Sequence, residues 1–111
     1  MTTTVSQSRP LWAPGVVLDL ALLAQVVRRV LAGVPAEVLL FGSQARGDAG
    51  PHSDIDIAVR GTQRLPHETL VALRAALEES NMVRRVDVVD WWAASPALRS
   101  TIEREGVQWL T

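Results

Sequence analysis

Lysine, cysteine and tyrosine are all missing from this sequence of 111 residues. Without cysteine the chain cannot form a disulfide, a thiolate zinc site or a cysteine nucleophile. All 11 basic residues are arginines, so the chemistry of a P-loop lysine or a Schiff-base lysine is excluded as well. The net charge of -1 gives no overall basic field that would draw the chain to nucleic acid or to a membrane surface.

The sequence contains no recognisable transmembrane or targeting segment. Its most apolar stretch, residues 15–34, includes Asp19, Gln25, Arg28 and Arg29, which would be costly inside a bilayer. The stretch also lacks the small-residue cleavage pattern of a secretory signal peptide. Together with the absence of cysteine, these features predict a cytoplasmic protein with no membrane partner.

The composition and length are those of one globular domain. The hydrophobic fraction is 48% and the charged fraction 21%, and a chain of this size can build a single core. Residues 1–15 are rich in Thr, Ser and Pro and are predicted to form a flexible N-terminal arm, which Trp12 could pin to the body. Residues 16–111 are predicted to form the folded domain.

Hydrophobic periodicity predicts three helices and four strands. Apolar residues recur at helical spacing from Leu20 to Leu31, Gly33 and Pro35 end that helix, and Asp19 is expected to cap its start. The other helices are expected at residues 65–81 and 95–106. The strands are expected at residues 37–41, 53–60, 84–92 and 106–111. This order predicts a small α/β or α+β sheet domain.

Two aspartates interrupt the second predicted strand. Because side chains alternate along a strand, Asp54 and Asp56 share one face, while Ile55 and Ile57 point into the core. Two carboxylates about 7 Å apart repel each other, and a divalent cation beside them removes that repulsion. Oxygen ligands suit Mg²⁺ or Mn²⁺. The alternative interpretation is a pair of exposed aspartates on an open sheet face.

The segment GSQARG, residues 42–47, precedes these aspartates. Gly42 directly after a strand permits a sharp turn and a close approach of the backbone to a ligand. Ser43 could cap a short helical turn or bind an anion, since free N–H groups at such a turn attract phosphate. Arg46 could contact a phosphate or brace the loop by pairing with a carboxylate.

The third predicted strand carries another isolated carboxylate, Asp87, among valines. It could add a third carboxylate from a neighbouring strand, or it could be a surface position on a half-buried edge. Asp90 has the opposite parity and lies at the strand end, so a structural or capping role is expected. The tryptophans expected in core or interface contacts are Trp91, Trp92 and Trp109.

Taken together, GSQARG at residues 42–47, SDID at residues 53–56 and the strand that contains Asp87 resemble the minimal nucleotidyltransferase (MNT) family of the DNA polymerase beta-like superfamily. The resemblance extends from about residue 18 to residue 111. It implies a small mixed β-sheet flanked by helices, the polymerase-beta-like nucleotidyltransferase fold.

The resemblance also implies a role for each motif residue. The residues expected to hold the nucleotide triphosphate are Gly42, Ser43 and Arg46. The expected catalytic residues and metal ligands are Asp54, Asp56 and Asp87. By this resemblance the first two aspartates hold two Mg²⁺ ions, and Asp87 completes the site that activates the attacking hydroxyl.

Stand-alone members of the MNT family resemble antitoxins paired with HEPN-domain RNase toxins, and some transfer AMP to a tyrosine of the toxin. The resemblance therefore predicts a Mg²⁺-dependent protein adenylyltransferase with ATP as substrate and a HEPN toxin as partner in a hetero-oligomer, without direct contact to nucleic acid. Because this chain has no tyrosine, a tyrosine target must lie in another molecule. Two alternatives stay open: an antitoxin that masks its toxin without catalysis, and a small-molecule nucleotidyltransferase that needs a helper subunit.

Overall fold

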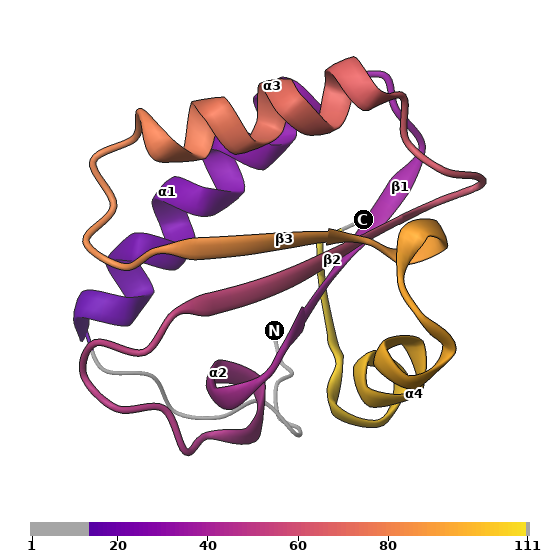
Figure 1. The fold of residues 1–111 in the computed structure, drawn as a ribbon. Coiled ribbons are helices and arrows are strands. Elements are labelled where there is room, and N and C mark those ends of the chain that lie inside the picture. Colours follow the sequence, from indigo (N-terminus) through magenta and orange to yellow (C-terminus); the bar gives the residue numbers. More distant parts are fainter. Residues whose placement is uncertain (1–13, 111) are drawn as a thin grey trace, which may run out of the picture.

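The computed structural model describes residues 14–110, which form one sheet with helices on both faces (Figure 1). The helices are α1 (Pro14–Val30), α2 (Ser43–Arg46), α3 (His67–Glu78), the 3-10 helix η1 (Trp91–Ala93) and α4 (Pro96–Glu105). The strands are β1 (Ala36–Phe41), β2 (Ile55–Gly61), β3 (Val86–Asp90) and β4 (Val107–Leu110). Trp12 and most of the predicted arm lie outside the described residues, so the arm stays a prediction.

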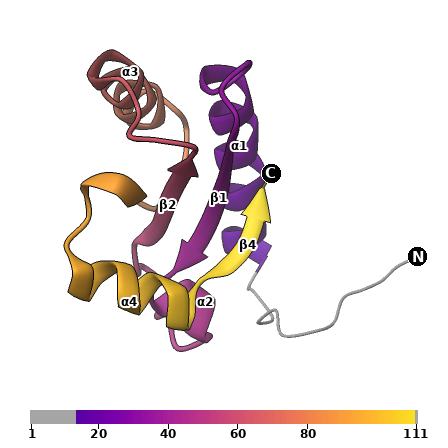
Figure 2. The ribbon, with the colours of Figure 1, turned by 90° about the vertical axis from the view of Figure 1, so that its right-hand side faces the viewer.

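The sheet is mixed, as predicted. Its strand order is β3-β2-β1-β4, with β1 antiparallel to both β2 and β4 and with β2 parallel to β3. A parallel pair needs a crossover connection, which α3 supplies between β2 and β3. Figure 2 shows β4 returning beside β1 after α4.

Each face of the sheet has its own apolar cluster. The larger cluster packs α1 and α3 against side chains that include Ile55, Ile57 and Val59, all of which are fully buried. The smaller cluster lies on the other face and joins the sheet to α4 and η1. Its buried members are Leu39, Phe41, Ala58, Trp91 and Ile102. The alternation predicted for β2 is confirmed, and its opposite face is covered at Ala58 rather than open along its whole length.

The helix and strand ends follow local capping. Ser95 accepts a hydrogen bond from the backbone of Leu98 and begins α4, as expected. The third strand ends at Asp90, earlier than the predicted residue 92, because the Asp90 side chain accepts the N–H of Trp92 and starts η1. Asp90 is therefore the structural and capping residue that its parity predicted.

The expectation for Asp19 was wrong. Asp19 lies beyond the first turn of α1, is buried, and accepts hydrogen bonds from the backbone N–H groups of Val83 and Arg84 rather than from its own helix. The sequence could not reveal this, since the partner segment lies 64 residues away.

Within residues 14–110, no helix combines the length and the apolar character that crossing a membrane requires.

Asp90→Ala should destabilise the fold by about 2–4 kcal/mol. The Asp90 carboxylate is 3% exposed and accepts from the N–H of Leu65 at 2.9 Å and from that of Trp92 at 3.0 Å. Each buried donor that is left unpaired costs about 1–3 kcal/mol. Urea unfolding measures the change, and Asp90→Asn, which keeps one accepting oxygen, should lose about half as much. Equal losses for the two variants would contradict this account.

Candidate active site

The topology brings three segments to one place. Because β1 and β2 are antiparallel, Phe41 at the end of β1 lies opposite Asp56 near the start of β2. Because β2 and β3 are parallel, Asp56 also lies beside Asp87. The turn that follows Phe41 and the predicted carboxylates therefore meet on the face of the sheet that carries α2 and α4 (Figure 1).

Gly42 allows the turn after β1 to lie close to Asp56. Its φ of 76° is in the left-handed region, which glycine adopts without strain. A Cβ atom placed on Gly42 would lie 2.3 Å from Oδ2 of Asp56, so any side chain here would collide with the carboxylate. The close backbone approach that the sequence suggested is thus an approach to Asp56, and it brings the start of α2 against the carboxylate.

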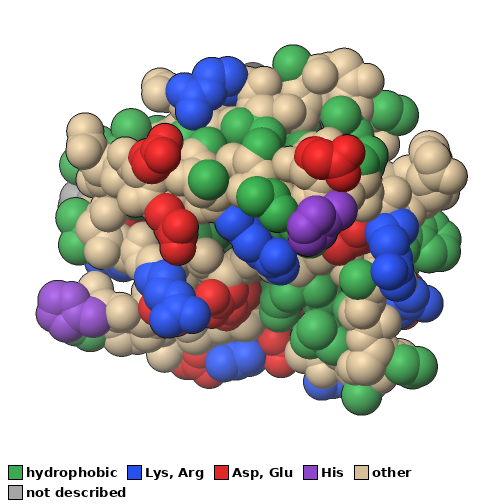
Figure 3. Space-filling view, turned by 45° about the horizontal axis from the view of Figure 1, so that its top comes forward, with side chains coloured by type: hydrophobic (Ala, Val, Ile, Leu, Met, Phe, Trp, Pro, Cys, Tyr) green, Lys and Arg blue, Asp and Glu red, His purple; other side chains and the backbone are tan. Residues whose placement is uncertain are grey.

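The three predicted carboxylates differ in burial. Asp54 lies just before β2 and is exposed, whereas Asp56 is half-buried within the strand. The Asp87 side chain is 42% exposed and pairs with Arg85 at 3.3 Å. On the face that shows α3 and the neighbouring sheet edge, basic and acidic side chains are interspersed (Figure 3).

The pKa of Asp56 reflects its burial and the neighbouring carboxylates. Burial, together with the nearby negative charges of Asp87 and Asp54, raises the pKa of Asp56 to about 6. Arg46 opposes the shift, and Glu105 adds to it. Ionised Asp56 is therefore held in a region of excess negative charge, which a cation would relieve.

The donor chemistry of the site fits Mg²⁺. In the described part of the chain, no three His, Cys, Asp or Glu side chains are grouped so that they could hold a metal ion by themselves. Mg²⁺ does not require such a cage, because it usually binds one or two carboxylates together with water and substrate phosphates. Asp54 and Asp56 can supply these one or two carboxylates, and Asp87 lies on the adjacent strand next to Asp56.

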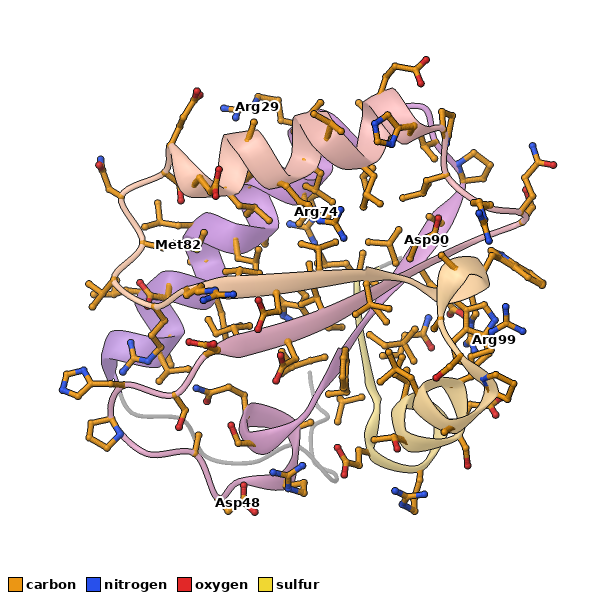
Figure 4. All side chains as sticks on the ribbon, in the orientation of Figure 1. Arg29, Asp48, Arg74, Met82, Asp90 and Arg99 are labelled. Atoms are coloured by element: carbon orange, nitrogen blue, oxygen red, sulfur yellow. The ribbon has the colours of Figure 1, made fainter. Side chains whose placement is uncertain are left out.

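The structure shows whether Ser43 caps a helix and whether Arg46 braces the loop. Ser43 is the first residue of α2, and the cap position belongs to Gly42, so Ser43 is not a side-chain cap. Arg46 pairs with Asp48 at 3.1 Å and with Glu105 at 3.1 Å, which is the bracing role that the sequence allowed. Figure 4 shows Asp48 on the loop that follows α2. Contact of either residue with phosphate stays a prediction.

Glu105 is the site residue that sequence reasoning missed. Its Oε1 atom accepts both the N–H of Gly42 at 3.2 Å and Nη1 of Arg46 at 3.1 Å. It is the last residue of α4, and β4 then returns beside β1. The sequence carried no local signal for this contact, because Glu105 is 63 residues away from Gly42.

Comparison with known proteins gives the family. The family model described as polymerase beta, nucleotidyltransferase matches residues 32–110, which include every residue of the site described above. The chain belongs to this nucleotidyltransferase family. The polymerase-beta-like fold that the sequence pattern implied is thereby confirmed.

Similar proteins within this nucleotidyltransferase family are known in some detail. The chain is 34% identical over 67 residues to the Probable protein adenylyltransferase MntA of Haemophilus influenzae, a match that covers 60% of this chain and 59% of that relative. The chain thus spans about three fifths of the length of this relative.

Two crystal structures are also similar to this nucleotidyltransferase. The first, a toxin-antitoxin with AMP-PNP, has a TM-score of 0.66 at 30% identity and covers 82% of this chain and 73% of the other. The second is a tri-AMPylated HEPN toxin of Shewanella oneidensis in complex with MNT antitoxin. Its TM-score is 0.62 at 28% identity, and the match covers 85% of this chain and 71% of the other.

Gly42→Ala should be far more harmful than the matched variant Gly33→Ala. Both glycines have positive φ, at 76° and 82°, but a Cβ at Gly33 would meet no heavy atom within 4 Å. Gly33→Ala therefore tests the backbone strain alone, of order 1 kcal/mol. Gly42→Ala adds the collision with Asp56, and thermal melting should show a clearly larger loss of stability. Equal losses in the two variants would mean that the turn moves away from Asp56 at little cost.

Asp56→Asn should stabilise the metal-free protein at pH 8 and not at pH 4. A raised pKa means that the folded chain binds the Asp56 proton more tightly than the unfolded chain does. This contribution to stability is complete below the ordinary value of 3.8 and is lost as the pH rises through about 6. Removing the charge should raise the free energy of unfolding by about 1–2 kcal/mol at pH 8, after allowance for solvent screening. Urea unfolding at both pH values without divalent cations measures it, and a variant that is less stable than the parent at pH 8 would contradict the assignment.

Proposed function

We propose that this protein is a Mg²⁺-dependent protein adenylyltransferase, an antitoxin that transfers AMP from ATP to a hydroxyl of a partner HEPN RNase toxin. The observation that carries the proposal is the contact of the Gly42 turn with Asp56, which has Asp87 beside it on the next strand. This contact supports the proposal, because the turn proposed to bind phosphate and the carboxylates proposed to bind metal lie side by side.

Each site residue has a role in this proposal. Gly42 lets the turn approach the triphosphate closely, while its own N–H donates to Glu105, and Ser43 offers its backbone N–H and its hydroxyl. Arg46 adds a positive charge near Asp56. The residues proposed to hold the metal ions are Asp54, Asp56 and Asp87. When bound, Mg²⁺ would supply neutralisation of the phosphate charge and acidification of the acceptor hydroxyl.

The transfer itself needs few groups from the protein. The acceptor oxygen forms a bond to the α-phosphorus of ATP, the bond from that phosphorus to the bridging oxygen breaks, and pyrophosphate leaves with the bonding electrons. The acceptor loses its proton in the same process. Asp87 is suited to assist there, because its partly exposed side chain lies on an edge strand that an incoming hydroxyl can reach.

The relatives support the choice of acceptor and partner. One relative is named a protein adenylyltransferase, one similar structure is a toxin-antitoxin with AMP-PNP, and another contains an AMPylated HEPN toxin. Because this chain contains no tyrosine, a modified tyrosine would belong to the partner, and the two chains would form a hetero-oligomer. We assign the pair to the cytoplasm, where ATP and Mg²⁺ are available.

Asp87→Asn should abolish transfer while leaving toxin binding nearly unchanged. The amide keeps the size of Asp87 but removes the charge proposed to help activate the acceptor hydroxyl, so the rate should fall by orders of magnitude. Mass spectrometry of a partner HEPN toxin, after incubation with this protein, ATP and Mg²⁺, measures the added AMP. Co-purification measures the complex, and Glu68→Gln, at an exposed carboxylate in the first turn of α3, is the control.

The same variant separates catalysis from masking. In cells that express the toxin, the enzyme hypothesis predicts that Asp87→Asn no longer protects growth. Full protection without added AMP would show that neutralisation is by binding. Transfer to a small molecule, with the toxin unmodified by the parent protein, would instead favour a nucleotidyltransferase that uses a helper subunit.

A further inference from the structure

A buried ion pair lies behind the carboxylates. The side chains of Asp19 in α1 and Arg84 in the loop before β3 are 4% and 9% exposed and are joined at 3.0 Å. Asp19 also accepts the N–H of Val83 at 3.2 Å and that of Arg84 at 3.1 Å, so α1 fixes the loop by its backbone as well. Hydrogen bonds to Arg84 help to lower the pKa of Asp19, which keeps this buried carboxylate ionised.

Arg84 also reaches a second loop. Its Nη2 donates to the carbonyl of Pro51 at 2.9 Å, in the loop that leads to β2. Asp54 follows Pro51 by three residues, just as Asp87 follows Arg84. One guanidinium thus ties α1 to the two segments that lead directly to two of the proposed metal ligands. The N–H of Ile55 donates to the carbonyl of Arg85 at 2.9 Å and joins the two segments again closer to the site.

The strand ladder cannot hold Asp54 by itself. Asp54 precedes β2, is exposed, and lies close enough to Asp56 to raise its pKa by repulsion. The loop must therefore resist the mutual repulsion of the carboxylates. The contacts that hold the loop include the bond from Arg84 to Pro51 and the bond from the Gly50 N–H to Ser53 Oγ at 2.8 Å.

The position of Arg84 leaves one of its polar atoms without a hydrogen bond. Among the described residues, its Nε is a buried polar atom with no hydrogen-bond partner, and such groups are rare in folded proteins. Replacing both Asp19 and Arg84 with apolar side chains would cost little, since buried ion pairs contribute little net stability, whereas removing Arg84 alone would leave the buried Asp19 charge unpaired.

We propose that Arg84 is a positioning residue, which sets the placement of Asp54 and Asp87 through the Pro51 carbonyl and its own backbone. It touches neither nucleotide nor acceptor. The inference rests on the proposed function, because it assigns Arg84 to the metal-binding carboxylates of that site. Residues that orient metal ligands in this way change metal affinity about 10- to 100-fold when they are replaced.

The test uses Arg84→Lys, which keeps a positive charge for Asp19 but has no planar fork to reach Pro51. The matched control is Arg99→Lys. Arg99 also donates to two backbone carbonyls, those of Trp91 at 2.9 Å and Trp92 at 2.7 Å, but at the opposite end of the sheet (Figure 4). Both variants should melt earlier than the parent, because both lose hydrogen bonds to backbone carbonyls.

The deciding measurement is the rise in melting temperature with Mg²⁺ at a fixed concentration of AMP-PNP, which cannot be turned over. Arg84→Lys should raise the Mg²⁺ concentration at the midpoint about 10-fold or more. Arg99→Lys should keep the midpoint of the parent. Asp19→Asn retains an accepting oxygen but loses the charge, and it should shift the midpoint in the same direction as Arg84→Lys. It replaces Arg84→Lys in the test if that variant does not fold.

The outcomes distinguish this inference from the proposed function. If Mg²⁺ and AMP-PNP stabilise the parent but the Arg84 and Asp19 variants keep its midpoint, Arg84 is only structural and the inference is overturned. If the parent is not stabilised at all, the proposed function fails and the inference fails with it. A shift confined to the Arg84 and Asp19 variants supports both.

Discussion

The contact between the backbone of Gly42 and the carboxylate of Asp56 is the constraint on which the site depends. It exists because β1 and β2 pair so that Phe41 faces Asp56, and because residue 42 has no side chain. A residue with a Cβ would separate the turn from the carboxylate and would also be strained at this φ. The groups proposed to bind phosphate and metal therefore come from two strands that are adjacent in the sheet.

This compactness concentrates negative charge. Asp54, Asp56 and Asp87 lie near one another, and the raised pKa of Asp56 is the measure of their repulsion and of its burial. The fully buried Ile55 and Ile57 anchor the same strand in the larger core, so the strand stays in place despite that repulsion. Stability from one face of β2 thus supports a charge arrangement on the other face that serves ligand binding at the expense of stability.

The sequence revealed what depends on local pattern and little of what depends on distant partners. Alternation along β2 predicted the core face, and the family motif predicted Gly42 and the aspartates. The cap at Ser95 was also predictable, because its partner is three residues away. The partners of Asp19 and Glu105 were not predictable, because each contact joins elements more than 60 residues apart. Such contacts depend on how helices pack, for which a single sequence has no periodic signal.

The same packing bears on how the proposed acceptor hydroxyl would reach the site. The smaller apolar cluster covers the α4 face of the sheet around Ala58 and Trp91, while Asp54 and Asp87 are left accessible at the start of β2 and β3. Tyrosine is absent from this sequence, so a tyrosine acceptor would have to belong to another molecule. An edge strand that carries Asp87 leaves its outer side free of a neighbouring strand. Under the proposed function, a partner protein that approaches this edge would bring its hydroxyl to the carboxylates and so take part in the reaction.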